Sequence, residues 1–154
     1  FGPGLEAVRH AIEQNPGSGF VCGMAGSAMV FGDDLENGLV LLERAMALGP
    51  LDPSFSMNLV VAGLAHLLRG RPDLAVELSE RSITLSPNWD SPYWLLTAGY
   101  TQLDRLPEAR SALAKFLLLA PGTTIAKLRK RLPIRNAESL ETILDGLRKA
   151  GLPD

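Results

Sequence analysis

The sequence predicts an all-α fold, a solenoid built from antiparallel pairs of helices. Prolines recur at a fixed spacing, because Pro16 and Pro50 lie 34 residues apart, as do Pro53 and Pro87 and then Pro87 and Pro121. A fixed period of this length is the signature of a stacked helix-turn-helix unit. Leu and Ala are abundant and aromatic residues make up only 6% of the chain, which favours helix over strand.

Small side chains recur at matching positions of this period. Ala75 is followed one period later by Ala109, and Gly26 and Ala45 take corresponding small-residue positions earlier in the chain. Two antiparallel helices approach to about 8–10 Å only where their crossing positions carry small residues. Each helix pair leaves one apolar face that the next pair buries, so the units are expected as a continuous array.

Acidic residues, glycines and prolines delimit the first half of this array. The helices expected there span residues 5–15, 19–31 and 34–48. Asp33 and Asp34 favour a helix start, because acidic groups stabilise the positive end of the helix dipole. Gly49 and Pro50 favour the following stop. The first helix is interpreted as a half-repeat whose partner helix lies upstream.

Prolines delimit the second half of the array. The helices expected there span residues 54–68, 72–85, 90–103 and 107–119. Pro72 and Pro107 fit the first turn of a helix, where the missing N–H of proline has no intrahelical partner to lose. Pro87 and Pro121 follow the expected helix ends, because the residue before a proline disfavours helical backbone angles.

After Pro121 the period fails and the charge changes sign. Residues 123–154 carry seven basic and four acidic side chains, and helices are expected at 124–131 and 137–149, the second begun by the cap Asn136 and ended by Gly151. These helices are interpreted as a C-terminal two-helix cap. The expected organisation is therefore a repeat domain over 1–122, with the half-repeat 5–16 and repeats at about 19–50, 54–87 and 88–121, followed by capping helices over 123–154.

Composition excludes several classes of function. The net charge of −2 gives no general attraction to nucleic acid or to an anionic membrane surface. One cysteine, Cys22, and two histidines leave no disulfide and no His/Cys metal cluster, so no metal or other cofactor is expected. No run of about 18 apolar residues is present, so no membrane insertion is expected. The first residues lack the layout of a secretion signal and are interpreted as an internal cut through a longer protein.

The repeated motifs resemble tetratricopeptide repeats over roughly residues 5–121. The segments that carry the resemblance are Ala45–Pro50, the junction Pro50–Pro53 with its three-residue insertion, and Ala109–Pro121. The resemblance implies a right-handed superhelix of antiparallel helix pairs and a role in protein–protein interaction.

Two segments of the tail carry a second resemblance. Residues 128–133 (LRKRLP) and 147–153 (LRKAGLP) are similar to the C-terminal end of bacterial, especially α-proteobacterial, class III adenylate/guanylate cyclases that carry such repeats. This resemblance implies a regulatory fragment of a cAMP-signalling protein, with the catalytic domain upstream. The family's catalytic features have no matching positions here, so the fragment itself is not expected to be an enzyme. The alternatives are the repeat region of a bacterial transcriptional regulator or kinase, or a self-associating scaffold.

The first helix of each pair lines the inner surface of a tetratricopeptide stack, and the positions expected to face it are mostly apolar. None carries a cation, which disfavours capture of a terminal carboxylate. The expected ligand is an apolar helix, an extended hydrophobic segment or another copy of the chain, which would form a homodimer. The alternative is that other domains of the same protein cover the surface. The candidate residues are Phe20, Val30, Phe31, Met57, Val60, Leu64, Leu67, Leu68, Trp94 and Gln102.

The basic residues of the tail form a second candidate surface, made of Lys127, Arg129, Lys130 and Arg131. Contact with nucleic acid or anionic lipid, and docking onto an acidic partner, are both open. Ion pairs with acidic groups of the following helix, or plain solvation of these charges, are favoured over both, and no nucleic acid partner is expected. The protein is expected in the cytoplasm, or in the periplasm if its parent has an upstream membrane span.

Structural roles explain the remaining single residues and acidic pairs better than catalytic roles do. The pairs Asp33/Asp34 and Glu77/Glu80 are interpreted as helix caps and solvated faces rather than acid/base dyads. His66 is interpreted as a packed side chain and Cys22 as a small core group, with sensing and thiol reactivity as the alternatives.

Overall fold

The computed structural model describes residues 2–154, and this part of the chain contains nine α-helices and no strand. The helices are α1 (Gly2–Gln14), α2 (Gly19–Phe31), α3 (Leu35–Ala47), α4 (Phe55–Leu68), α5 (Pro72–Leu85), α6 (Ser91–Gln102), α7 (Leu106–Leu119), α8 (Ile125–Arg131) and α9 (Ala137–Ala150). Every predicted helix is present. The bounds of α2 to α9 agree with the predicted ones to within one residue.

Helix α1 begins three residues earlier than predicted, at Gly2. Pro3 therefore lies in its first turn. This position tolerates proline, because the first backbone N–H groups of a helix have no intrahelical acceptor.

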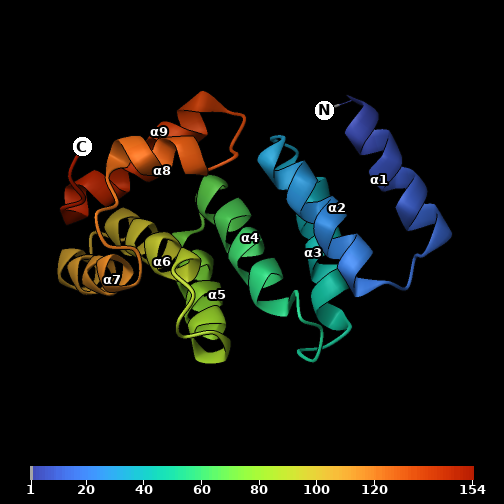
Figure 1. The fold of residues 1–154 in the computed structure, drawn as a ribbon, viewed down its shortest axis with the longest axis horizontal. Helices are drawn as coiled ribbons and strands as arrows, with labels where there is room; N and C mark the ends of the chain where they lie inside the picture. The colour runs from blue at the N-terminus through green and yellow to red at the C-terminus, as the bar shows by residue number, and fades with distance from the viewer. Residues whose placement is uncertain (1) are drawn as a thin grey trace.

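The helices α1 to α7 form a serial pile in which each helix contacts the next one in the sequence (Figure 1). The paired helices α2 and α3 make close contact, as do α4 and α5, and then α6 and α7. Contacts between α2 and α4 and between α4 and α6 join the first helices of successive pairs. These three helices form one continuous inner face.

Glycines permit the closest of these crossings. A methyl group at Gly26 of α2 would lie 2.7 Å from the Leu42 side chain and 2.8 Å from the carbonyl oxygen of Gly38 in α3. Gly63 of α4 and Gly99 of α6 also lie at close crossings, because an added methyl would lie 2.9 Å from Leu95 of α6 and 2.9 Å from Val76 of α5, respectively. The small residues of the period therefore lie at helix crossings, as the sequence predicts.

The predicted helix caps of the tail are confirmed. The Asn136 side chain accepts a hydrogen bond from the backbone N–H of Ser139 at 3.1 Å, and Gly151 ends α9 with a φ of 117°. The apolar stripe of α9 is buried, with Ile143, Leu144 and Leu147 fully covered.

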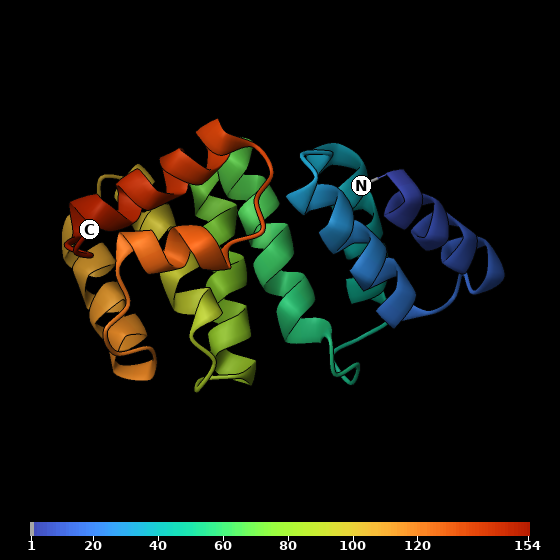
Figure 2. The same cartoon turned by 45° about the horizontal axis from the view of Figure 1, so that its top comes forward.

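The two C-terminal helices do more than close the end of the pile. Helix α9 packs against both α6 and α7, and the segment between α8 and α9 returns as far as α2, where the backbone N–H of Arg135 donates to the carbonyl oxygen of Phe31 at 3.0 Å. Figure 2 shows the orange and red C-terminal helices lying across the green and yellow helices of the pile. The inner face is thus partly covered by the chain's own end.

Candidate interaction surface

The inner face of α2, α4 and α6 divides into three parts. We call them the N-terminal groove, the middle groove and the polar cleft. The N-terminal groove is lined by Phe20, Gly23, Met24, Ser27, Phe31, Asp52, Pro53, Ser54, Met57 and Asn58. The middle groove is lined by Phe31, Met57, Val60, Val61, Leu64, Trp89, Ser91, Trp94, Arg131, Leu132 and Pro133. The polar cleft lies between α9 and the ends of α4 and α6.

The N-terminal groove is apolar and open, with a volume of about 730 Å³. Phe20, Met24 and Met57 are 58%, 54% and 48% exposed, although all three are large hydrophobic side chains. Among the described residues that line the groove, Asp52 is the only ionisable one. Hydrogen bonds from the side chain and backbone N–H of Ser54 hold the pKa of Asp52 below its ordinary value, so this carboxylate is charged at neutral pH.

The middle groove is narrower, about 260 Å³, because the C-terminal linker (residues 131–136) lies across it. Leu132 and Pro133 of the linker face α4, where Val60 and Leu64 are 4% and 2% exposed. The linker has extended backbone angles at both ends, at Leu132 and at Asn136. An extended, apolar and proline-containing segment therefore already lies on this part of the inner face.

Polar contacts hold the linker in this position. The Arg131 guanidinium donates to both carboxylate oxygens of Asp90, at 2.6 and 2.8 Å, and one of its nitrogens also donates to the Ser91 hydroxyl at 3.1 Å. These hydrogen bonds hold the pKa of Asp90 below its ordinary value and raise that of Arg131. At the other end of the linker, the Asn136 amide donates to Asp33 at 2.9 Å.

The linker leaves one polar group of the inner face without a partner. The indole Nε1 of Trp94 is buried and has no hydrogen-bond acceptor among the described residues. A buried donor without an acceptor costs about 1–3 kcal/mol. The linker thus covers the apolar surface of Trp94 but does not satisfy its N–H.

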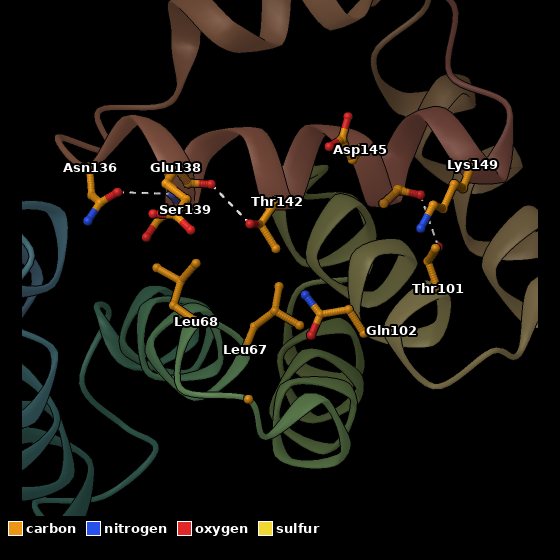
Figure 3. A pocket seen from close by; sticks show the side chains of 12 residues that line it. Leu67, Leu68, Thr101, Gln102, Asn136, Glu138, Ser139, Thr142, Asp145 and Lys149 are labelled. Atoms are coloured by element: carbon orange, nitrogen blue, oxygen red, sulfur yellow. Dashed lines mark hydrogen bonds between the residues drawn. The ribbon is translucent and has the colours of Figure 1, made fainter.

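The polar cleft, about 490 Å³ in volume, differs in chemistry from the two grooves. Figure 3 shows Leu67, Leu68 and Gln102 facing the α9 side chains Ser139 and Thr142 across it. Beside the cleft, the Thr101 hydroxyl shares its hydrogen between the carbonyl oxygens of Thr97 and Gly146, at 2.9 and 3.0 Å, and so joins α6 to α9.

Five of the predicted inner-surface residues are buried, so this structure does not expose them to a partner. Val60, Leu64 and Trp94 are covered by the C-terminal linker, and Leu67 is 2% exposed in the core beside the polar cleft. The Val30 side chain points away from the inner face, because it packs against Gly38 of α3. These residues contribute to packing and cannot contact a partner in this conformation.

The other five predicted residues are accessible but do not form one surface. Phe20, Phe31 and Met57 line the N-terminal groove, whereas Leu68 and Gln102 line the polar cleft. Sequence reasoning missed Asp52 and Asp90, the two carboxylates at the inner face. Asp52 lies three residues before α4 and Asp90 lies directly before α6, so a position just before an inner helix is the signal that could have found them.

Three of the four basic tail residues have internal partners. Arg129 forms an ion pair with Glu141 of α9, as predicted for this helix, and Arg131 binds Asp90, which was not predicted. The Lys127 ammonium donates to the carbonyl oxygen of Gly122 at 2.8 Å. Lys130 is exposed, and no partner is seen for it in the described residues. The four residues therefore do not act as one free cationic patch.

The two singled-out residues lie within the packed structure. Cys22 is fully buried. His66 is half-buried, its Nδ1 has no hydrogen-bond partner in residues 2–154, and burial lowers its pKa, with a further contribution from the charge of Arg71. Within those residues no group of three or more His, Cys, Asp and Glu side chains could hold a metal ion, and no helix is long and apolar enough to cross a membrane.

Comparison with solved structures identifies the architecture. The crystal structure of MamA superposes with a TM-score of 0.70 at 16% identity, over 95% of this chain and 84% of the MamA chain. PilW, a widely conserved type IV pilus biogenesis factor, superposes with a TM-score of 0.73 at 16% identity, over 94% of this chain and 63% of the PilW chain. The fold is a tetratricopeptide-type solenoid.

Within this tetratricopeptide-type fold, a MamA structure described as MSR-1 C2 is 23% identical, with a TM-score of 0.64 over 95% of this chain and 82% of that chain. No family model matches the sequence, and no curated protein matches it. The predicted fold class is confirmed. The predicted relation to cyclases has no support beyond the tail motifs.

Proposed function

We propose that this chain is a protein-interaction module that binds an apolar segment of a partner protein in the N-terminal groove. The observation that carries the proposal is the exposure of Phe20, Met24 and Met57 around a groove of about 730 Å³. Large hydrophobic side chains that surround a concave surface gain free energy when a partner removes them from water. The tetratricopeptide-type fold is consistent with such a role.

The rest of the inner face supports a binding role for this groove in particular. The linker covers the middle groove, and the polar cleft lacks a continuous apolar lining. The N-terminal groove is the part of the described inner face where apolar side chains stay exposed over several neighbouring positions. Binding rather than catalysis is proposed, because Asp52 is the only ionisable side chain among the described residues that line this groove.

A peptide-display selection on the immobilised chain tests the proposal. Selected peptides should be apolar and should bind at least about tenfold more weakly to Met24→Lys, because a lysine would place a charge inside the groove. Val40→Lys is the matched control, since Val40 is 60% exposed on α3 and lies outside the groove. Peptides that bind wild type and Met24→Lys equally would contradict the proposal.

Self-association is a distinct outcome of the same variants. If sedimentation velocity shows a wild-type dimer that Met24→Lys abolishes and Val40→Lys preserves, the groove binds a second copy of this chain rather than a partner protein. A monomer at all concentrations leaves the partner assignment in place.

The finer assignment to a cyclase-like signalling protein remains a proposal that rests on the tail motifs at residues 128–133 and 147–153. A cytoplasmic location belongs to the same proposal. The coding sequence upstream of Phe1 tests both. A class III cyclase domain there would support the assignment, whereas a kinase or a DNA-binding domain would favour the alternative signalling proteins.

A further inference from the structure

The N-terminal groove repeats the middle groove one helix pair earlier in the chain. Four inner-face residues of α4 line the middle groove, and the four residues of α2 that lie 37 positions before them line the N-terminal groove. The α4 residues are Met57, Val60, Val61 and Leu64, and the corresponding α2 residues are Phe20, Gly23, Met24 and Ser27.

The helix crossings give the same register independently. Gly26 faces the carbonyl oxygen of Gly38 in α3, and Gly63 faces that of Ala75 in α5. Both members of the second pair lie 37 residues after those of the first. Helices α2 and α4 therefore present equivalent faces, and the two grooves are successive copies of one feature of the repeat.

The middle groove shows what such a groove accepts. The chain itself places there an extended segment in which a cation, Arg131, is followed by the apolar residues Leu132, Pro133 and Ile134. The cation binds Asp90, directly before α6, and the apolar residues that follow cross toward α2. Along the linker, the first contact is thus with a carboxylate at the start of one inner helix, α6. The next contacts are with the face of the preceding inner helix, α4.

The N-terminal groove offers the same order of chemistry. Asp52 lies three residues before α4 and lines the groove. The exposed face of the preceding inner helix, α2, lines the same groove with Phe20 and Met24. The segment Gly19–Asn58 contains five carboxylates and one arginine, a net charge of −4 that favours a cationic partner. Ser27 takes the position that Leu64 has in the middle groove, and this smaller residue leaves room for a larger apolar side chain of the ligand.

We infer that the N-terminal groove binds, from a partner protein, an extended segment with the chemistry of the linker. This segment has an arginine or lysine that reaches Asp52, followed by two or three apolar residues, one of them proline, on the face of α2. The inference rests on the proposed function and specifies its ligand. Proline suits the site because its fixed backbone angle lowers the conformational entropy lost when an extended segment binds.

Methyl NMR of the four methionines tests the inference on the full chain. The probe is a synthetic capped peptide with the sequence of residues 130–135, Lys-Arg-Leu-Pro-Ile-Arg. Binding in the N-terminal groove shifts the methyl signals of Met24 and Met57 and leaves that of Met46, which lies beside Pro50 and Phe55, in place. A shift of the Trp94 indole signal without a shift of Met24 would mean that the peptide replaces the linker, which overturns the inference.

A charge cycle tests the role of Asp52. A second peptide carries citrulline, a neutral isostere, in place of the arginine that precedes leucine. It should bind about two- to fivefold more weakly to wild type, the range for an exposed ion pair, and the difference should vanish in Asp52→Asn. Equal binding of both peptides to wild type overturns the inference.

The failures of the two proposals are distinguishable. If uncharged apolar peptides from the display selection shift Met24 while the linker peptide does not, the ligand chemistry inferred here is wrong and the proposed function stands. If no peptide of either kind shifts Met24, both are wrong.

Discussion

Arg131 and Asp90 lie 41 residues apart in the sequence and form a bidentate ion pair across the inner face. Two parallel N–H···O bonds fix the orientation of both groups, which a lysine at position 131 could not do. The pair joins the end of α8 to the start of α6 and thereby sets where the linker crosses α4. The position of the C-terminal helices depends on this contact as well as on apolar burial.

Replacing Arg131 with Met should destabilise the protein by no more than about 1 kcal/mol, because the guanidinium is 43% exposed and solvent screens the pair. The loss should be larger at low than at high salt concentration. Urea unfolding at two NaCl concentrations measures it. A loss that does not depend on salt would mean that the arginine acts through its apolar stem.

The pH dependence of the same variant follows from the lowered pKa of Asp90. A carboxyl group whose pKa is depressed in the folded state stabilises the protein above its unfolded pKa of about 3.9, and this contribution is lost as pH falls through the folded pKa. The difference in unfolding free energy between wild type and Arg131→Met should therefore be present at pH 6 and shrink below pH 4. A difference that is constant over this range would contradict the prediction.

Gly26→Ala should destabilise the protein by about 1–3 kcal/mol, because the new methyl group would clash with the backbone oxygen of Gly38 as well as with Leu42. Thermal unfolding measures the effect. Gly4→Ala is the control, since nothing lies within 4 Å of its added methyl and alanine favours helix over glycine. It should leave the stability unchanged or raise it by up to about 1 kcal/mol.

The lowered pKa of His66 predicts that the protein loses stability in mild acid. Burial lowers the folded-state pKa of His66, so below the unfolded pKa of about 6.5 the unfolded chain binds a proton that the folded chain does not. The unfolding free energy should therefore fall as pH decreases from 7.5 toward 5.5. His66→Phe, measured by urea unfolding across this range, should flatten the dependence, and His10→Phe controls for the loss of a histidine as such.

The hydrogen bond from the Thr101 hydroxyl to α9 is expected to contribute to the stability of the contact between α6 and α9. Thr101→Val removes the hydrogen bond to the Gly146 carbonyl oxygen at similar side-chain volume, and it should cost about 1 kcal/mol. Amide hydrogen exchange should rise mainly in α9 and the linker rather than in α2 and α3. A uniform rise along the chain would mean that α9 does not open separately.

Much of the fold was predictable from local patterns. The proline period, the small crossing residues and the caps Asn136 and Gly151 each act within one helix pair or one helix end, so the sequence contains their full cause. The helix bounds agree with the structure for this reason. The start of α1 was predicted three residues too late, although the first turn of a helix accepts a proline such as Pro3.

The candidate surface was predictable only in part, because its exposure depends on a contact distant in sequence. The apolar stripe of α9 indicates that this helix is buried on one side but not against which helix. Nothing local to Val60 or Leu64 indicates that residues 131–136 cover them. A large aromatic residue at an inner position, Trp94, was interpreted as part of a binding surface, whereas it is 4% exposed and lines the middle groove together with the linker.

The equivalence of the two grooves limits the binding valency of the chain. Because the linker lies on one of two successive copies of the groove, the inferred binding mode predicts that a single chain engages one segment of this kind, in complexes of one-to-one stoichiometry. Avidity for a partner with several such segments would then come only from joining several chains. A solenoid extended by more helix pairs of the same kind would gain one further binding position with each pair.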